Sequence, residues 1–127
     1  MKQIEQTYFI KASAESVWKA LTNAKIIGKW GAGPAEFQAT EGGKFSLWGG
    51  DINGINTKVE KNNLLEQDWY GHDHPDRCYK VAFKLKSSDG NTVVTLSHAD
   101  VPDEEEKDFA DGWKDYYFDP IKELLEK

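Results

Sequence analysis

Residue types that bind transition metals gather in one short stretch near the middle of the chain. His72 and His74 are separated by one residue, Cys78 follows four positions later, and His98 lies further along. A His-x-His pair on extended backbone points both rings the same way, and a Cys thiolate would add a third ligand. Structural zinc sites, however, usually show four ligands at regular spacing, and residues 75–77 are Pro, Asp and Arg. The stretch therefore predicts a polar hairpin loop and no metal site.

Other patterns typical of enzymes are incomplete. Cys78 alternates with Lys80 and Lys84, which predicts an outward-facing thiol, and no oxyanion motif accompanies it. The Gly-Gly pairs at 42–43 and 49–50 do not form a phosphate-binding loop, because neither opens a helix or precedes Gly-Lys-Ser/Thr. Paired carboxylates remain possible, although most acidic residues fall on predicted solvated faces. The sequence therefore predicts no catalytic residue and no cofactor, and leaves enzymatic activity open.

Three polar residues interrupt the apolar faces of predicted strands: Thr57, Gln67 and His98. A buried polar group without a partner costs about 1–3 kcal/mol, so each needs a hydrogen bond. The partner can be backbone, a neighbouring side chain or a buried water. Alternatively, these residues orient the polar end of an apolar ligand, as sparse polar groups do in binding pockets. Both interpretations stay open.

Aromatic side chains are abundant, with five Trp, five Tyr and six Phe in 127 residues. Such side chains bury large areas, but they leave gaps where they line a wide space. A cavity between a sheet and a helix is therefore a second hypothesis beside a filled core. The candidate ligand-binding residues of such a cavity are Phe45, Leu47, Thr57, Gln67, Trp69, Phe83, His98, Phe109, Trp113 and Tyr117.

Alternating residues predict the strands that would position these side chains. Residues 3–11 alternate between two faces with a period of two. Residues 35–99 form a series of alternating segments separated by tight-turn signals at 41–44, 53–54, 61–63 and 88–91. Short turns imply antiparallel neighbours, and one-sided patterning implies that one face is covered. The chain therefore predicts about seven antiparallel strands.

Helical patterns occur at two places. Ser13 and Asn23 are typical N-caps of two short helices directly after the first strand. Residues 103–126 carry apolar side chains at spacings of three and four, and Pro120 should bend this helix. The predicted fold is α+β, a curved antiparallel sheet around one long C-terminal helix in the helix-grip arrangement. Residues 1–127 are predicted to form a single domain.

The net charge of −6 excludes two classes of partner. Nucleic acid backbones and anionic membrane surfaces would be repelled, and no basic run offsets the field. No stretch approaches the ~18 apolar residues that span a bilayer. Residues 1–6 lack the apolar stretch of a signal peptide, and Cys78 has no second Cys for a disulfide. The sequence therefore predicts a cytoplasmic protein.

An ordered set of motifs resembles a known family. Residues 17–22 (Val-Trp-Lys-Ala-Leu-Thr), Trp30, residues 41–45 (Glu-Gly-Gly-Lys-Phe) and Gly112-Trp113 are similar to the family of activators of the heat-shock protein 90 ATPase, within the START-like (SRPBCC) superfamily. Residues 101–122 look most like the C-terminal domain of the co-chaperone itself. The resemblance implies a helix-grip fold enclosing a hydrophobic cavity, which in the superfamily holds lipids, sterols or polyketides.

The resemblance also limits what can be expected. The full-length co-chaperone has a further N-terminal domain that makes much of the chaperone contact, so ATPase stimulation is not implied by the matching region alone. The first hypothesis is a non-enzymatic domain that binds an apolar or amphipathic small molecule between sheet and helix. The alternatives are a co-chaperone-like module that binds a heat-shock protein 90 homologue, and an enzyme for small hydrophobic substrates.

Overall fold

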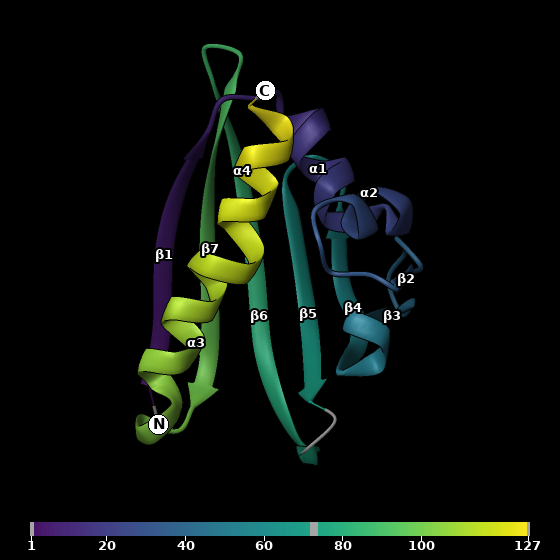
Figure 1. Ribbon diagram of the computed structural model, residues 1–127, viewed down its shortest axis with the longest axis vertical. Coiled ribbons are helices and arrows are strands. Elements are labelled where there is room, and N and C mark those ends of the chain that lie inside the picture. Colours follow the sequence, from purple (N-terminus) through teal and green to yellow (C-terminus); the bar gives the residue numbers. More distant parts are fainter. Residues whose placement is uncertain (1, 72–73, 127) are drawn as a thin grey trace.

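A computed structural model describes residues 2–71 and 74–126 of the chain. Within these ranges the chain forms one curved antiparallel sheet of seven strands. The spatial order is β1-β7-β6-β5-β4-β3-β2, so the first strand pairs with the last (Figure 1). The strands are β1 (Lys2–Ile10), β2 (Glu36–Phe37), β3 (Lys44–Leu47), β4 (Ile52–Glu60), β5 (Leu64–Gly71), β6 (His74–Ser88) and β7 (Asn91–Val101). The predicted α+β fold is thereby confirmed.

Two short helices follow β1, as their capping residues predict. The Ser13 hydroxyl accepts a hydrogen bond from the Ser16 N–H at 3.2 Å, which begins α1 (Ala14–Thr22). The Asn23 side chain accepts from the backbone N–H groups of residues 25 and 26, which begins α2 (Ala24–Lys29). Both caps satisfy amide donors that the first turn of a helix leaves unpaired. The two helices lie against one end of the C-terminal helix (Figure 1).

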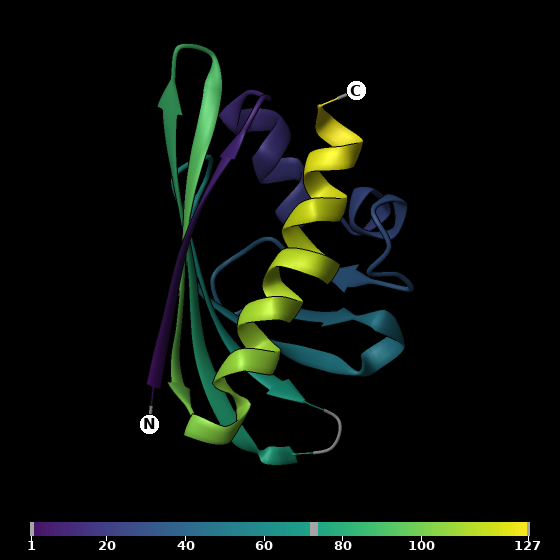
Figure 2. The same ribbon diagram turned by 60° about the vertical axis from the view of Figure 1, so that its left-hand side comes forward.

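The C-terminal helix crosses the concave face of the sheet (Figure 2). It consists of η2 (Asp103–Glu105), α3 (Glu106–Gly112), a π-helical segment η3 (Trp113–Phe118) and α4 (Asp119–Leu125). Pro120 cannot donate a hydrogen bond to the Tyr116 carbonyl, and its ring would crowd that carbonyl in a regular α-helix. The widened π turns directly precede this proline, and the Asp119 N–H bonds to the Lys114 carbonyl. The irregularity therefore lies mainly before Pro120.

Two sequence expectations about the strands need correction. Residues 72–77 were expected to form a hairpin loop, but β6 already begins at His74. Thr57 was expected to face the helix, but it is exposed, whereas Asn56 is fully buried. The pairing of β4 with β5 shifts register between Asn56 and Lys58, which is a β-bulge. A bulge adds one residue to a strand and reverses the alternation beyond it. A strict period of two therefore assigns the residues on one side of the bulge to the wrong face of the sheet.

Candidate functional site

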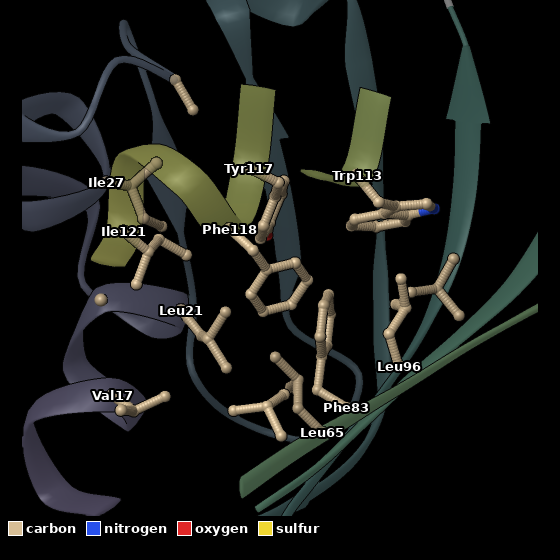
Figure 3. Packing of buried hydrophobic residues seen from close by; sticks show 14 of the residues in the cluster. Val17, Leu21, Ile27, Leu65, Phe83, Leu96, Trp113, Tyr117, Phe118 and Ile121 are labelled. Carbon is tan, nitrogen blue, oxygen red and sulfur yellow. The ribbon is translucent and has the colours of Figure 1, made fainter. Parts of the chain in front are cut away.

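Buried aromatic rings fill the space between the middle of the sheet and the helix. The Phe83 ring stacks on Tyr117 with ring centroids 5.8 Å apart and meets Trp113 edge-on at 5.7 Å. Phe118 lies against Phe83 and, on its other side, stacks on Tyr8 at 4.2 Å. All of these rings except Tyr8 are buried (Figure 3). The space between the middle of the sheet and the C-terminal helix is therefore a packed core, as protein interiors normally are.

Two buried polar residues of the sheet, Asn56 and Gln67, bond to one another. The Trp69 indole N–H donates to the Gln67 side-chain oxygen at 2.6 Å, and the Gln67 amide donates to Asn56 at 2.9 Å. The Asn56 amide in turn donates to the Gln38 carbonyl at 2.7 Å. These three hydrogen bonds form a polar relay. Gly54 is required beside the relay, because a Cβ there would collide with the Asp68 carbonyl and the Phe45 ring. Gln67 is therefore satisfied by protein groups.

His98 is a further buried polar residue of the core. The Trp113 indole N–H donates to its Nδ1 at 2.9 Å, so the neutral ring carries its proton on Nε2. Nε2 has no hydrogen-bond partner in the described part of the chain. Burial lowers the pKa of His98 to about 4, and the nearby Glu105 carboxylate only partly opposes this shift. His98 is therefore neutral at pH 7 and fixes the orientation of Trp113.

An open cleft lies between the C-terminal helix and the part of the sheet that contains β4, β5 and the turn between β3 and β4. Its volume is about 260 Å³, slightly below the roughly 300–1,000 Å³ typical of small-molecule pockets. The sheet side contributes residues around the short 3₁₀ turn η1 (Trp48–Gly50), and the helix side contributes α3 and η3. The lining residues are Trp48, Ile52, Trp69, Asp108, Phe109, Gly112, Trp113, Tyr116 and Tyr117.

Unusual backbone positions Trp48 at this cleft. Its φ angle is +50°, a left-handed conformation that is sterically costly for a bulky residue, and Gly49 and Gly50 continue it at +67° and +102°. The Trp48 N–H donates to the Ala32 carbonyl at 2.8 Å, and the Gly49 N–H donates to the Pro34 carbonyl at 2.9 Å. These bonds hold the turn in place. Strained residues of this kind cluster at functional sites, so the cleft is the strongest candidate site.

The structure distributes the ten predicted ligand-binding residues over three environments. Four of them line the cleft: Trp69, Phe109, Trp113 and Tyr117. Five others are buried in the packed core and do not line the cleft: Phe45, Leu47, Gln67, Phe83 and His98. Thr57 is exposed, so the prediction that it meets a ligand between sheet and helix is wrong.

Sequence reasoning missed part of the cleft. Strand alternation predicted Trp48 on the face opposite Phe45 and Leu47. The left-handed turn instead places the Trp48 side chain at the cleft. The Trp-Gly-Gly sequence at 48–50 was the available signal, since two glycines after an aromatic residue permit such a turn. Ile52, Asp108, Gly112 and Tyr116 complete the part that was not predicted.

Comparison with known proteins identifies the family. A family model described as "Activator of Hsp90 ATPase homolog 1-like protein" matches residues 11–126. The chain belongs to this family. One relative, activator of 90 kDa heat shock protein ATPase homolog 2 of Mus musculus, is 26% identical over 121 residues. The match covers 94% of this chain but only 37% of that relative.

A second sequence relative and a solved structure agree with this assignment. Activator of 90 kDa heat shock protein ATPase homolog 1 of Homo sapiens is 24% identical over 114 residues, which cover 89% of this chain and 34% of the human protein. The chain thus spans about a third of the length of these relatives. The crystal structure of an HSP90 activator from Plasmodium falciparum has the same fold, with a TM-score of 0.91 at 23% identity, covering 99% of this chain and 97% of that one.

The motifs that resemble the family have structural roles in this member. The Trp30 indole N–H donates to the Ala20 carbonyl at 2.8 Å, which ties the segment after α2 to α1. Gly42 has a φ angle of +83°, and a Cβ at Gly43 would collide with the Gln38 carbonyl. Trp113 connects the core to the cleft. These motif residues maintain the fold, and only Trp113 and the neighbouring Gly112 reach the cleft.

The expected absence of a metal site stays a prediction. The side chains of His72 and His74 lie outside the described residues, and Cys78 is partly exposed on the strand paired with β5. Among the residues that are described, no group of three or more potential ligands could hold an ion. No helix in the described ranges is long and apolar enough to cross a membrane.

Proposed function

We propose that the chain binds a heat-shock protein 90 homologue and alters its ATPase rate, with the aromatic cleft as part of the contact surface. The observation that carries this proposal is the combination of a filled core with an open cleft in a member of this family. A carrier of lipids or sterols needs an enclosed space, whereas an open aromatic cleft suits an anchoring side chain of a protein partner.

The exposed part of the cleft supports a protein contact. Tyr116 is 70% exposed and Trp48 is half-buried, so both rings are available to a partner. Tyr and Trp are enriched among the residues that contribute most to binding energy at interfaces. The core behind them is rigid, because Trp69 and Trp113 are each fixed by a hydrogen bond from the indole. Preorganised side chains of this kind lose little entropy on binding.

The test is complex formation with the heat-shock protein 90 homologue of the same organism. We expect the whole chain to form a complex measurable by calorimetry and to change the steady-state ATPase rate. Replacing Trp48 by Asn removes the ring while tolerating the left-handed backbone, so binding should weaken without unfolding. A wild-type chain that neither binds the chaperone nor changes its ATPase rate would refute the proposal.

A second function is favoured by the apolar lining of the cleft: binding of a small aromatic or amphipathic molecule in place of a protein side chain. The volume of about 260 Å³ lies slightly below the range typical of small-molecule pockets, so such a ligand is small. A ligand at 100 times its Kd should add about 2.7 kcal/mol of stability. A thermal-shift screen should therefore show stabilisation in the wild type and none in Trp48→Asn if this second function holds.

A further inference from the structure

The charge of the molecule is concentrated on the C-terminal helix. Residues 103–126 contain ten acidic and three basic residues, a formal charge of −7, whereas the whole chain carries −6. The rest of the chain is therefore close to neutral, at +1. The helix forms one wall of the cleft, so any group that approaches the cleft meets a negative field. Such a field attracts cations and raises their rate of association.

One carboxylate that lines the cleft has no hydrogen bond or ion pair with a described residue. Asp108 lines the cleft from α3 and interacts with the neighbouring Lys107 only through its charge, whereas Asp51, next to the lining residue Ile52, does not itself line the cleft. Neither side chain has a hydrogen bond or an ion pair with a described residue. By contrast, Asp111 on the same helix pairs with Lys107 at 2.9 Å. The Asp108 carboxylate is thus available to an incoming cation.

Aromatic rings form most of the rest of the cleft wall. The Trp69 and Trp113 centroids are 4.9 Å apart, and Tyr117 lies 6.3 Å from Trp48. The indole N–H groups of Trp69 and Trp113 donate to Gln67 and His98 in the core, so the cleft is lined by ring carbon. A cation over the face of Trp or Tyr is attracted by the ring quadrupole. An apolar group would gain burial against these rings but no attraction to the Asp108 carboxylate.

We propose that the cleft receives a lysine or arginine side chain presented by the partner protein. The aliphatic stem lies against the Trp48 and Trp113 rings, and the charged end reaches Asp108. The identity of the partner rests on the proposed function, but the chemical preference of the cleft does not. A neutral apolar anchor is the competing occupant.

A titration of the whole labelled chain tests the preference directly. The probes are N-acetyl-lysine N-methylamide and N-acetyl-norleucine N-methylamide, which lacks the ammonium group, and the reporter is the NMR signal of the Trp48 indole N–H. We expect the lysine probe to bind at least about threefold more tightly at low ionic strength, and the difference to shrink in high salt. Equal or tighter binding of norleucine, or no response to either probe, would overturn the inference.

Matched variants assign the preference to Asp108. Asp108→Asn should bring the affinities for the two probes to within about twofold of each other. Asp89→Asn removes the same charge at the β6–β7 turn, where the φ of +52° suits Asn, and should keep the preference for lysine. An equal loss of preference in both variants would show that net charge, and not the cleft, selects the cation, and would overturn the inference.

Binding to the chaperone separates this inference from the proposed function. If the inference holds, Asp108→Asn weakens the complex by about threefold or more, while Asp89→Asn leaves it within about twofold. If the wild type and Asp108→Asn bind equally, the proposed function stands and the lysine or arginine occupant is wrong. If the wild type does not bind at all, the proposed function fails, and the probe titration alone decides the preference of the cleft.

Discussion

The packed core and the cleft are built from the same kinds of side chain but have opposite properties. In the core, Phe83, Phe118 and Gln67 are buried and the Gln67 amide is hydrogen-bonded. At the cleft, Tyr116 is exposed and Asp108 makes no hydrogen bond or ion pair with a described residue. Trp113 and Tyr117 belong to both regions, since each is buried and also lines the cleft. Aromatic content therefore does not distinguish a core from a binding surface, because buried and exposed rings occur on the same helix.

The largest expected contrast concerns two aromatic residues three positions apart on the helix. Trp113→Ala should lower the free energy of unfolding by about 3–5 kcal/mol, because a buried indole is lost and His98 loses its partner. Tyr116→Ala should change it by less than about 0.5 kcal/mol, because the ring is 70% exposed. Urea denaturation of both variants measures the difference. A small effect at Trp113 would mean that the helix does not pack on the sheet as described.

Acid should weaken the core through His98. Its pKa is lowered from 6.5 to about 4 in the folded chain, so the unfolded state binds the proton more readily. Stability from this residue is fully present above about pH 6.5 and is lost as the pH falls towards 4, by about 3 kcal/mol in total.

The control for this pH effect is His98→Asn, whose side-chain oxygen can still accept from Trp113 but does not titrate. Urea denaturation at pH 7 and at pH 4 should show a larger loss of stability in the wild type than in the variant. Equal losses in both proteins would mean that other groups, such as the many carboxylates, carry the acid sensitivity.

Breaking the polar relay should have a smaller effect. Gln67→Met keeps the shape of the side chain but leaves Trp69 without an acceptor and Asn56 without a donor, which should cost about 1–3 kcal/mol. Removing Asn56 in the same background should cost less than in the wild type, because the two residues are coupled. A double-mutant cycle by chemical denaturation measures the coupling, and strict additivity would contradict the relay.

A small effect on stability is also expected at Trp48, on the sheet side of the cleft. Trp48→Asn should change the free energy of unfolding by less than about 1 kcal/mol, because loss of contact with Tyr117 is partly offset by relief of the left-handed backbone. Thermal denaturation monitors this change, and calorimetric titration with the chaperone monitors binding. A large loss of stability would mean that Trp48 belongs functionally to the core.

The sequence alone was sufficient for the architecture. Alternation in β5, β6 and β7 correctly placed Leu65, Phe83 and Leu96 on the buried face, and the three-four spacing correctly predicted the C-terminal helix. These patterns are local, because side-chain direction follows directly from the strand and helix periods. The capping residues Ser13 and Asn23 also act within three residues of themselves.

Tertiary structure decided the site. The bulge in β4 exchanges Thr57 for Asn56 on the inner face, and bulges are set by pairing with a neighbouring strand. The left-handed turn at Trp48 is held by carbonyls of residues 32 and 34, which no local pattern connects to it. The sequence therefore determined which side chains face the helix, and only the packed molecule determined where a cleft remains between them.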